Sequence, residues 1–131
     1  MTRDQILRLY AVAPHLFPAP PRNSIECGEG WYSPILGFCE EAEKACVALG
    51  ITLQVEQIKE KLGGLRIYFV NRAPPEIQVL LEEAEDRCAA TCETCGDHGK
   101  PSSAGGWLAV RCEKCQAAAL ERAAAFDKRV R

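Results

Sequence analysis

The chain has 131 residues, of which 47% are apolar and 26% are charged, with 16 Lys+Arg against 18 Asp+Glu. This length and composition predict a folded protein with its own core and exclude a disordered chain. No apolar run approaches the roughly 20 residues that span a bilayer, which excludes a membrane protein. Because Arg3, Asp4 and Arg8 interrupt the first residues, we expect no signal peptide and a cytoplasmic location.

The charge is unevenly distributed along the chain. Residues 31–90 hold six basic and ten acidic groups, a net charge of −4, whereas residues 91–131 hold seven basic and five acidic groups, a net charge of +2. An acidic body with a slightly basic C-terminal part is not typical of a strong non-specific nucleic-acid binder.

The first 30 residues predict a helix followed by a connector. Thr2 and Gln5 have the spacing of a capping box, and the apolar stripe that follows predicts a short helix ending before Pro14. Residues 14–29 then include Pro14, Pro18, Pro20, Pro21 and Gly28, and we interpret this segment as an extended connector.

The next segment predicts a helix and a β-hairpin. Ser33 and Pro34 form a typical helix start, and the apolar periodicity runs to a C-terminal glycine at Gly50. Alternation over residues 51–55 predicts one strand, and alternation over residues 65–69 predicts its partner. Since Ile58 breaks the alternation, we expect a bulge or an early strand end near Gln57.

Pro74 and Pro75 begin another predicted helix, after which the chain changes character at Thr91. A strand is expected from Trp107 to Val110, followed by an alanine-rich helix over about residues 113–128. The sequence therefore predicts an α+β fold, in which helices pack on a small antiparallel hairpin or sheet. We expect two parts, an α+β body over residues 1–90 and a metal-binding module over residues 91–131 that ends in a helix.

Four of the eight cysteines form two C-x2-C pairs, Cys92 with Cys95 and Cys112 with Cys115, separated by 16 residues. Paired thiolates at this spacing are typical of one tetrahedral Zn²⁺ site, and the order of knuckle, hairpin, knuckle and helix is that of a treble-clef finger. Four thiolates leave no open position on the metal, so the predicted zinc is structural. His98 is an alternative for one of the four ligands.

The remaining four cysteines do not form a recognisable metal-binding pattern. Cys39, Cys46 and Cys88 fall on apolar helix faces, where we expect them in the core, whereas Cys27 lies in the connector. The motifs of a nucleophile elbow or a phosphate-binding loop are absent, and we expect a protein without enzymatic activity.

Three segments occur together in a known group of proteins: Gly28–Tyr32 before a helix, the hairpin sequence from Gln57 to Tyr68, and the finger from Cys92 to Cys115. In this respect residues 28–116 resemble small proteins of bacteriophages, prophages and bacteria, which combine a KEK-x-GGLR-x-Y hairpin with a C-terminal zinc knuckle. The second knuckle of that group often ends in His, where this chain has Cys115. The resemblance implies no biochemical activity.

The leading hypothesis is a zinc-stabilised interaction protein that binds a host protein or complex, including a bacterial defence complex that it would inhibit. The alternative is a nucleic-acid-binding zinc finger with a regulatory role, in which Trp107 stacks on a base. Arg66 and Tyr68 are expected on the face of the hairpin opposite Leu65, Ile67 and Phe69. The predicted partner surface consists of Lys59, Lys61, Arg66, Tyr68, Trp107, Arg111 and Lys114.

Overall fold

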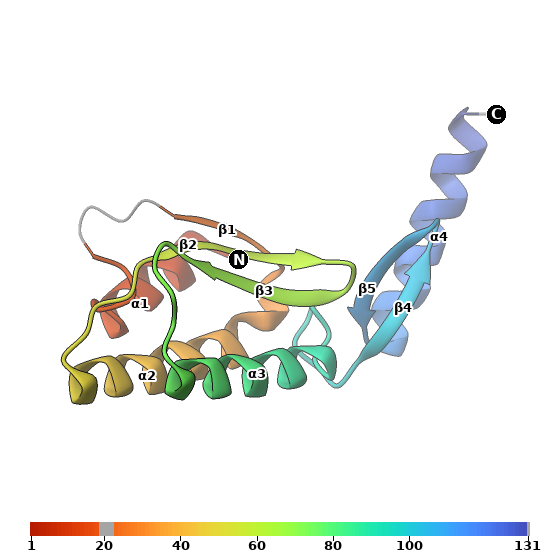
Figure 1. Cartoon of the computed structure of the whole chain (residues 1–131). Coiled ribbons are helices and arrows are strands. Elements are labelled where there is room, and N and C mark those ends of the chain that lie inside the picture. Colours follow the sequence, from red (N-terminus) through yellow and green to blue (C-terminus); the bar gives the residue numbers. More distant parts are fainter. Residues whose placement is uncertain (19–22, 131) are drawn as a thin grey trace.

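A computed structural model describes residues 1–18 and 23–130 of the chain. Four α-helices, one short 3-10 helix and five strands follow one another within these residues (Figure 1). In chain order they are α1 (Arg3–Val12), β1 (Ser24–Glu26), η1 (Glu29–Trp31), α2 (Tyr32–Leu49), β2 (Val55–Lys61), β3 (Gly64–Phe69), α3 (Pro75–Ala89), β4 (Lys100–Ala104), β5 (Trp107–Arg111) and α4 (Glu113–Val130).

The body is built on a three-stranded sheet in the order β1-β2-β3. β2 and β3 form the predicted antiparallel hairpin, and their pairing shifts register between Val55 and Gln57, which confirms the bulge expected there. β1 pairs in parallel with β2, so that α2 is the crossover between two parallel strands. The interpretation of residues 14–29 as a plain connector was therefore incomplete, and its residues 19–22 lie outside the described part of the chain.

The first strand of the hairpin lies later in the chain than the alternation predicted. Residues 51–54 precede β2, and their amides bond to other parts of the body: Ile51 donates to the carbonyl of Cys46 and Leu53 to that of His15. The strand then continues past Gln57 to Lys61, so an early strand end there is excluded.

α2 and α3 cover one face of the sheet (Figure 1). α2 and α3 pack against each other and α3 packs on β3, while α1 packs on α2. Trp31, Ile35, Ile58, Leu65 and Ile77 are all fully or almost fully buried between these elements. This arrangement confirms the predicted α+β class.

Local sequence predicted the starts of α1 and α2, and the structure confirms the first of these predictions. Thr2 and Gln5 form the complete capping box that the sequence predicts for α1. α2 begins one residue before Ser33, because η1 leads directly into it and Trp31 occupies the N-cap position. The prediction of Ser33 as the N-cap was therefore wrong, although the helix itself and its end at Gly50 are confirmed.

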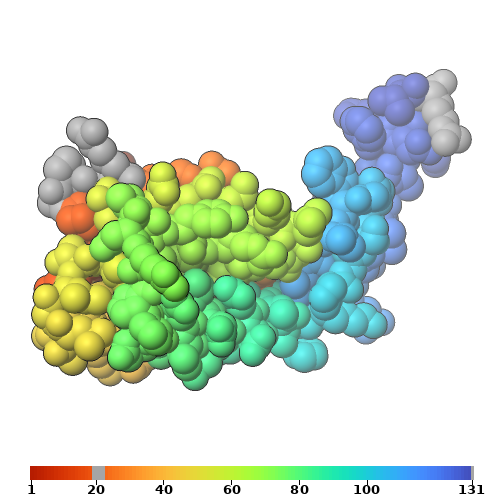
Figure 2. All heavy atoms as spheres, viewed as in Figure 1, coloured from red at the N-terminus to blue at the C-terminus, as the bar shows by residue number. Residues whose placement is uncertain are grey.

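The C-terminal part consists of the β4–β5 hairpin and α4, which extends away from the body (Figures 1 and 2). α4 packs on β4 and β5. None of the helices in the described ranges combines the length and apolar character that a bilayer crossing requires.

Candidate metal centre

The first C-x2-C pair lies in a tight turn directly after α3. The amide of Gly96 donates to the carbonyl of Cys92 at 2.9 Å, and the amide of Cys92 donates to the carbonyl of Asp97 at 2.7 Å. Gly96 has a φ of 85°, which a residue with a side chain adopts only with strain. The glycine after the second cysteine therefore closes the knuckle.

The second pair lies where β5 ends and α4 begins. Cys112 immediately precedes α4, and Cys115 lies in its first turn. The amide of Cys115 points at the sulfur of Cys112 at 3.4 Å, and the amide of Gln116 donates to the carbonyl of Cys112 at 2.9 Å. A helix N-terminus thus directs backbone N–H groups toward the sulfurs, which favours thiolates at this position.

The two knuckles bring all four sulfurs together. The Sγ atoms of Cys92, Cys95, Cys112 and Cys115 all lie within 4.8 Å of one another, and those of Cys95 and Cys112 are 3.6 Å apart. Bonds of about 2.3 Å to a tetrahedral metal require sulfurs about 3.8 Å apart. The four cysteines therefore form a cluster that can hold one metal ion, and His98 lies outside this cluster among the described residues.

The electrostatics of the cluster also suit a metal. Burial opposes ionisation of Cys92, but the amides of Cys112, Cys95 and Thr94 outweigh it and lower the pKa of Cys92 to about 6. The pKa of Cys115 is raised to about 12, chiefly by the neighbouring sulfur of Cys112. Without a cation, four adjacent thiols resist losing all their protons, whereas a divalent metal would stabilise the thiolates.

The cluster is attached to the body through Glu93. Its carbonyl accepts a hydrogen bond from the amide of Gly30 at 2.8 Å, and its carboxylate accepts one from the amide of Gly28 at 2.8 Å. A methyl group on Gly30 would overlap the backbone of Cys92 and Glu93. Trp31 completes the contact, because its fully buried indole donates to the carbonyl of Thr91 at 2.8 Å.

These contacts give the Gly28–Trp31 motif a role that sequence reasoning missed. The two glycines allow the backbone of the body to approach the first knuckle closely, and Trp31 fixes its position. The signal in the sequence was the G-x-G-W pattern, but nothing in it indicated that its partners lie 60 to 65 residues later. The hydrogen bonds cross the predicted boundary at residues 90/91, and the independence of the two parts stays a prediction.

The predicted partner-surface residues fall into separate groups. Arg66 is paired in register with Lys59, and Tyr68 with Gln57, on the sheet face opposite the buried Leu65 and Ile67. Tyr68 is 42% exposed, which agrees with the prediction that it lies on the face opposite the core. Lys61 is exposed at the end of β2. Whether these residues bind a partner stays a prediction.

The second group lies in the C-terminal part. Trp107 and Arg111 are at opposite ends of β5 and line the hollow between the hairpin and α4, whereas Lys114 is exposed on the first turn of α4. Arg122 and Phe126 of α4 line the same hollow. Sequence reasoning missed Phe126, although Ala119, Arg122, Ala123 and Phe126 have the spacing of one helix face.

The remaining cysteines lie apart from the cluster. Cys39, Cys46 and Cys88 are buried in the core, which confirms the prediction for all three. Burial raises the pKa of Cys39 and that of Cys88 to about 12. Cys27 is half-buried, and burial together with the nearby Glu93 raises its pKa to about 11.

Comparisons of this chain with protein-family models, with curated proteins and with solved structures found no match. The function is therefore argued from the geometry of the chain itself.

Proposed function

We propose that the chain is a non-enzymatic interaction protein whose C-terminal part is stabilised by one structural Zn²⁺ and which binds a protein partner. The four-cysteine cluster carries the first half of this proposal. Tetrahedral sulfur sites of this kind take zinc or iron, and zinc requires no redox role. With four thiolates bound, the metal has no position for water or substrate, which supports a structural role and not catalysis.

The role in binding is supported by exposed aromatic side chains in the C-terminal part of the chain. Trp107 is 78% exposed and Phe126 is 66% exposed, although side chains of this size are usually among the most buried. Tryptophan and arginine are enriched in the energetic centres of protein interfaces. The single observation that favours a protein partner is that Trp107, Arg111 and Arg122 line one hollow.

The proposal also includes the origin of the partner, which we infer to be the host cell because the sequence resembles phage and prophage proteins. A phage-encoded interaction protein acts in the host cytoplasm, and its partner would be a host protein or complex, such as a defence complex that it inhibits. Genes for defence or anti-defence proteins next to the gene for this chain would support that identity.

Nucleic-acid binding is the second candidate, because an exposed Trp107 in a hollow that two arginines also line suits base stacking. The acidic side chains of Glu113, Glu121 and Asp127 interrupt the basic groups of α4, so few phosphates can be neutralised together. This is why we favour the protein partner.

The test is affinity capture from a lysate of the host cell, with and without nuclease, on the zinc-loaded full-length chain. The proposal expects a captured protein that survives nuclease treatment and that, once purified, forms a defined complex with the chain in size-exclusion chromatography. Retention of nucleic acid alone, lost with nuclease, would favour the second candidate and contradict the protein partner.

A further inference from the structure

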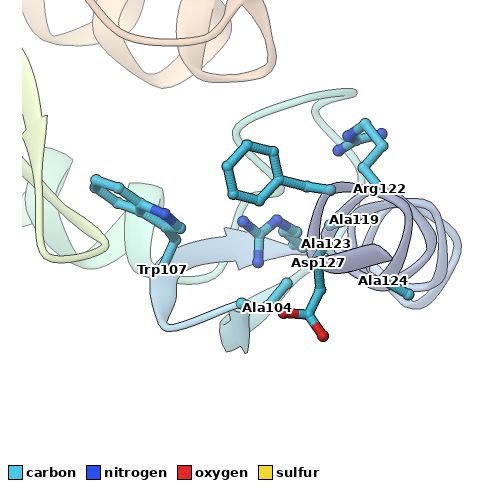
Figure 3. A pocket seen from close by; sticks show the side chains of 10 residues that line it. Ala104, Trp107, Ala119, Arg122, Ala123, Ala124 and Asp127 are labelled. Atoms are coloured by element: carbon cyan, nitrogen blue, oxygen red, sulfur yellow. The ribbon is translucent and has the colours of Figure 1, made fainter. Parts of the chain in front are cut away.

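A groove runs between the β4–β5 hairpin and α4, with a volume of about 720 Å³. Figure 3 shows Trp107 on the hairpin side of this groove and Arg122, Ala119 and Ala123 on the helix side. A volume of this size is within the range of sites that bind small ligands or a few residues of a peptide.

The groove stays open because its helix wall is built from small residues. Ala119 and Ala123 lie one turn apart on α4, and Gly105 in the hairpin turn packs directly on Ala123. Ala104 and Ala119 are almost fully buried at the base of the groove. Larger side chains at these positions would fill the space, so the alanines define a groove with an apolar floor.

The aromatic side chains beside this floor are mostly exposed to solvent. Trp107 on β5 and Phe126 on α4 both line the groove. Burying an aromatic side chain removes 150–250 Å² of apolar surface from water, so a ligand that covers both would gain substantial hydrophobic free energy. A large apolar side chain of a partner, inserted between them, would provide that cover.

The cations in the groove are arginines. Arg111 is held in place because its guanidinium donates to the side chain of Gln116 at 3.0 Å, and Gln116 donates in turn to the carbonyl of Ser103 at 2.7 Å. Arg122 is exposed, and no hydrogen bond or ion pair within the described residues engages its side chain. Arginine forms paired hydrogen bonds with carboxylates, and a fixed guanidinium loses little entropy on binding one.

We propose that this groove binds a short acidic segment of a partner protein. A large apolar side chain of the segment enters between Trp107 and Phe126, and its carboxylates pair with Arg122 and Arg111. The inference rests on the proposed function and specifies the chemistry of its partner. A nucleic-acid strand fits less well, because the two arginines do not form a continuous track for phosphates.

The test is selection from a library of short random peptides on the zinc-loaded full-length chain, with counter-selection on the Trp107→Ala/Arg122→Ala double variant. We expect the enriched peptides to combine Asp or Glu with Trp, Phe or Leu. For a synthetic copy of the strongest peptide, Trp107→Ala and Arg122→Ala should each weaken binding by about tenfold. Arg8→Ala and Val79→Ala, which alter exposed side chains on α1 and α3, serve as matched controls and should leave the affinity unchanged.

Enrichment of basic peptides would overturn the inference. So would a selection in which no enriched peptide depends on Trp107 and Arg122 for binding. So would oligothymidylate that binds more tightly than the best peptide at about 150 mM salt. A self-association that is lost in the double variant, measured by sedimentation, would assign the groove to a second copy and would equally contradict it. If the lysate experiment yields a protein complex that the double variant still forms, the proposed function stands and only the groove assignment fails.

Discussion

The amide of Gly30 donates a hydrogen bond to the carbonyl of Glu93, between the two cysteines of the first knuckle, at 2.8 Å. This bond places the four-cysteine cluster directly against the body, next to the buried indole of Trp31. The stability of the body and that of the metal centre should therefore be coupled, because each provides part of the other's packing.

A methyl group at Gly30 tests this coupling. In Gly30→Ala the new Cβ overlaps backbone atoms of Cys92 and Glu93, which cannot rotate away. We expect a loss of about 2 kcal/mol or more in the free energy of unfolding, together with weaker metal retention. Thermal unfolding and metal content would measure both.

Gly37→Ala is the matched control. Its Cβ would meet only the end of the Arg87 side chain, and alanine is favoured over glycine inside a helix. This variant should be as stable as the unmodified chain or more so. Equal stability of the two variants would contradict the coupling of body and cluster.

Removal of one ligand should affect the whole C-terminal part. We expect Cys112→Ser to lose zinc and to unfold residues 91–131, because in small metal modules the binding free energy is largely folding free energy. Amide hydrogen exchange would show faster exchange over β4, β5 and the start of α4. The control is Cys39→Ala, a substitution in the core, and this variant should retain zinc. A Cys112→Ser variant with full zinc content would disprove the assignment of Cys112 as a ligand.

Alkylation of the native protein should separate the cysteines into two classes. At pH 8 the thiols of Cys39 and Cys88 remain protonated, since burial raises both pKa values to about 12, and they should react slowly. A chelator should unfold the C-terminal part, which removes the contacts that shift these pKa values, and should expose four reactive thiols on Cys92, Cys95, Cys112 and Cys115. Mass spectrometry of the labelled peptides would count them, and labelling that is unchanged by the chelator would exclude metal protection.

The open face of the sheet should tolerate substitution. Tyr68→Ala should change the free energy of unfolding by about 1 kcal/mol or less, because the side chain is 42% exposed. Ile67→Ala, on the buried face of the same strand, should cost about 2–5 kcal/mol. Chemical denaturation of both variants gives the comparison, and a larger cost for Tyr68→Ala would assign that residue to packing.

Duplex DNA should bind weakly. The body carries a net charge of −4 over residues 31–90, and the basic groups of α4 are interrupted by acids, so few phosphate contacts form at once. We expect no measurable specific binding to double-stranded DNA in a gel shift at about 150 mM salt, where the Debye length is near 8 Å. Sub-micromolar affinity that is lost when Arg111 and Lys114 become Ala would favour the nucleic-acid hypothesis.

Local sequence signals predicted much of this fold. The capping box of α1, the bulge near Gln57 and the hairpin face that carries Leu65 and Ile67 all depend on neighbouring residues. The cysteine spacing was sufficient to identify the cluster, because the geometry of a tetrahedral metal leaves few other arrangements.

The features that sequence reasoning missed depend on distant contacts. β1 has three residues and exists because β2 lies beside it, so no periodicity could mark it. Residues 51–54 alternate like a strand, yet the amide of Ile51 bonds to the end of α2 and the amide of Leu53 bonds to the carbonyl of His15. The groove that contains Phe126 likewise forms only once α4 packs on the hairpin.

The closed metal site is the central claim, and X-ray absorption at the zinc edge of the purified full-length protein tests it most directly. The predicted result is one zinc per chain with four sulfur neighbours at about 2.3 Å and no lighter atom in the first shell. A first shell with a nitrogen or oxygen neighbour at about 2.0 Å, from His98 or from water, would contradict it, because the site would then not consist of four thiolates.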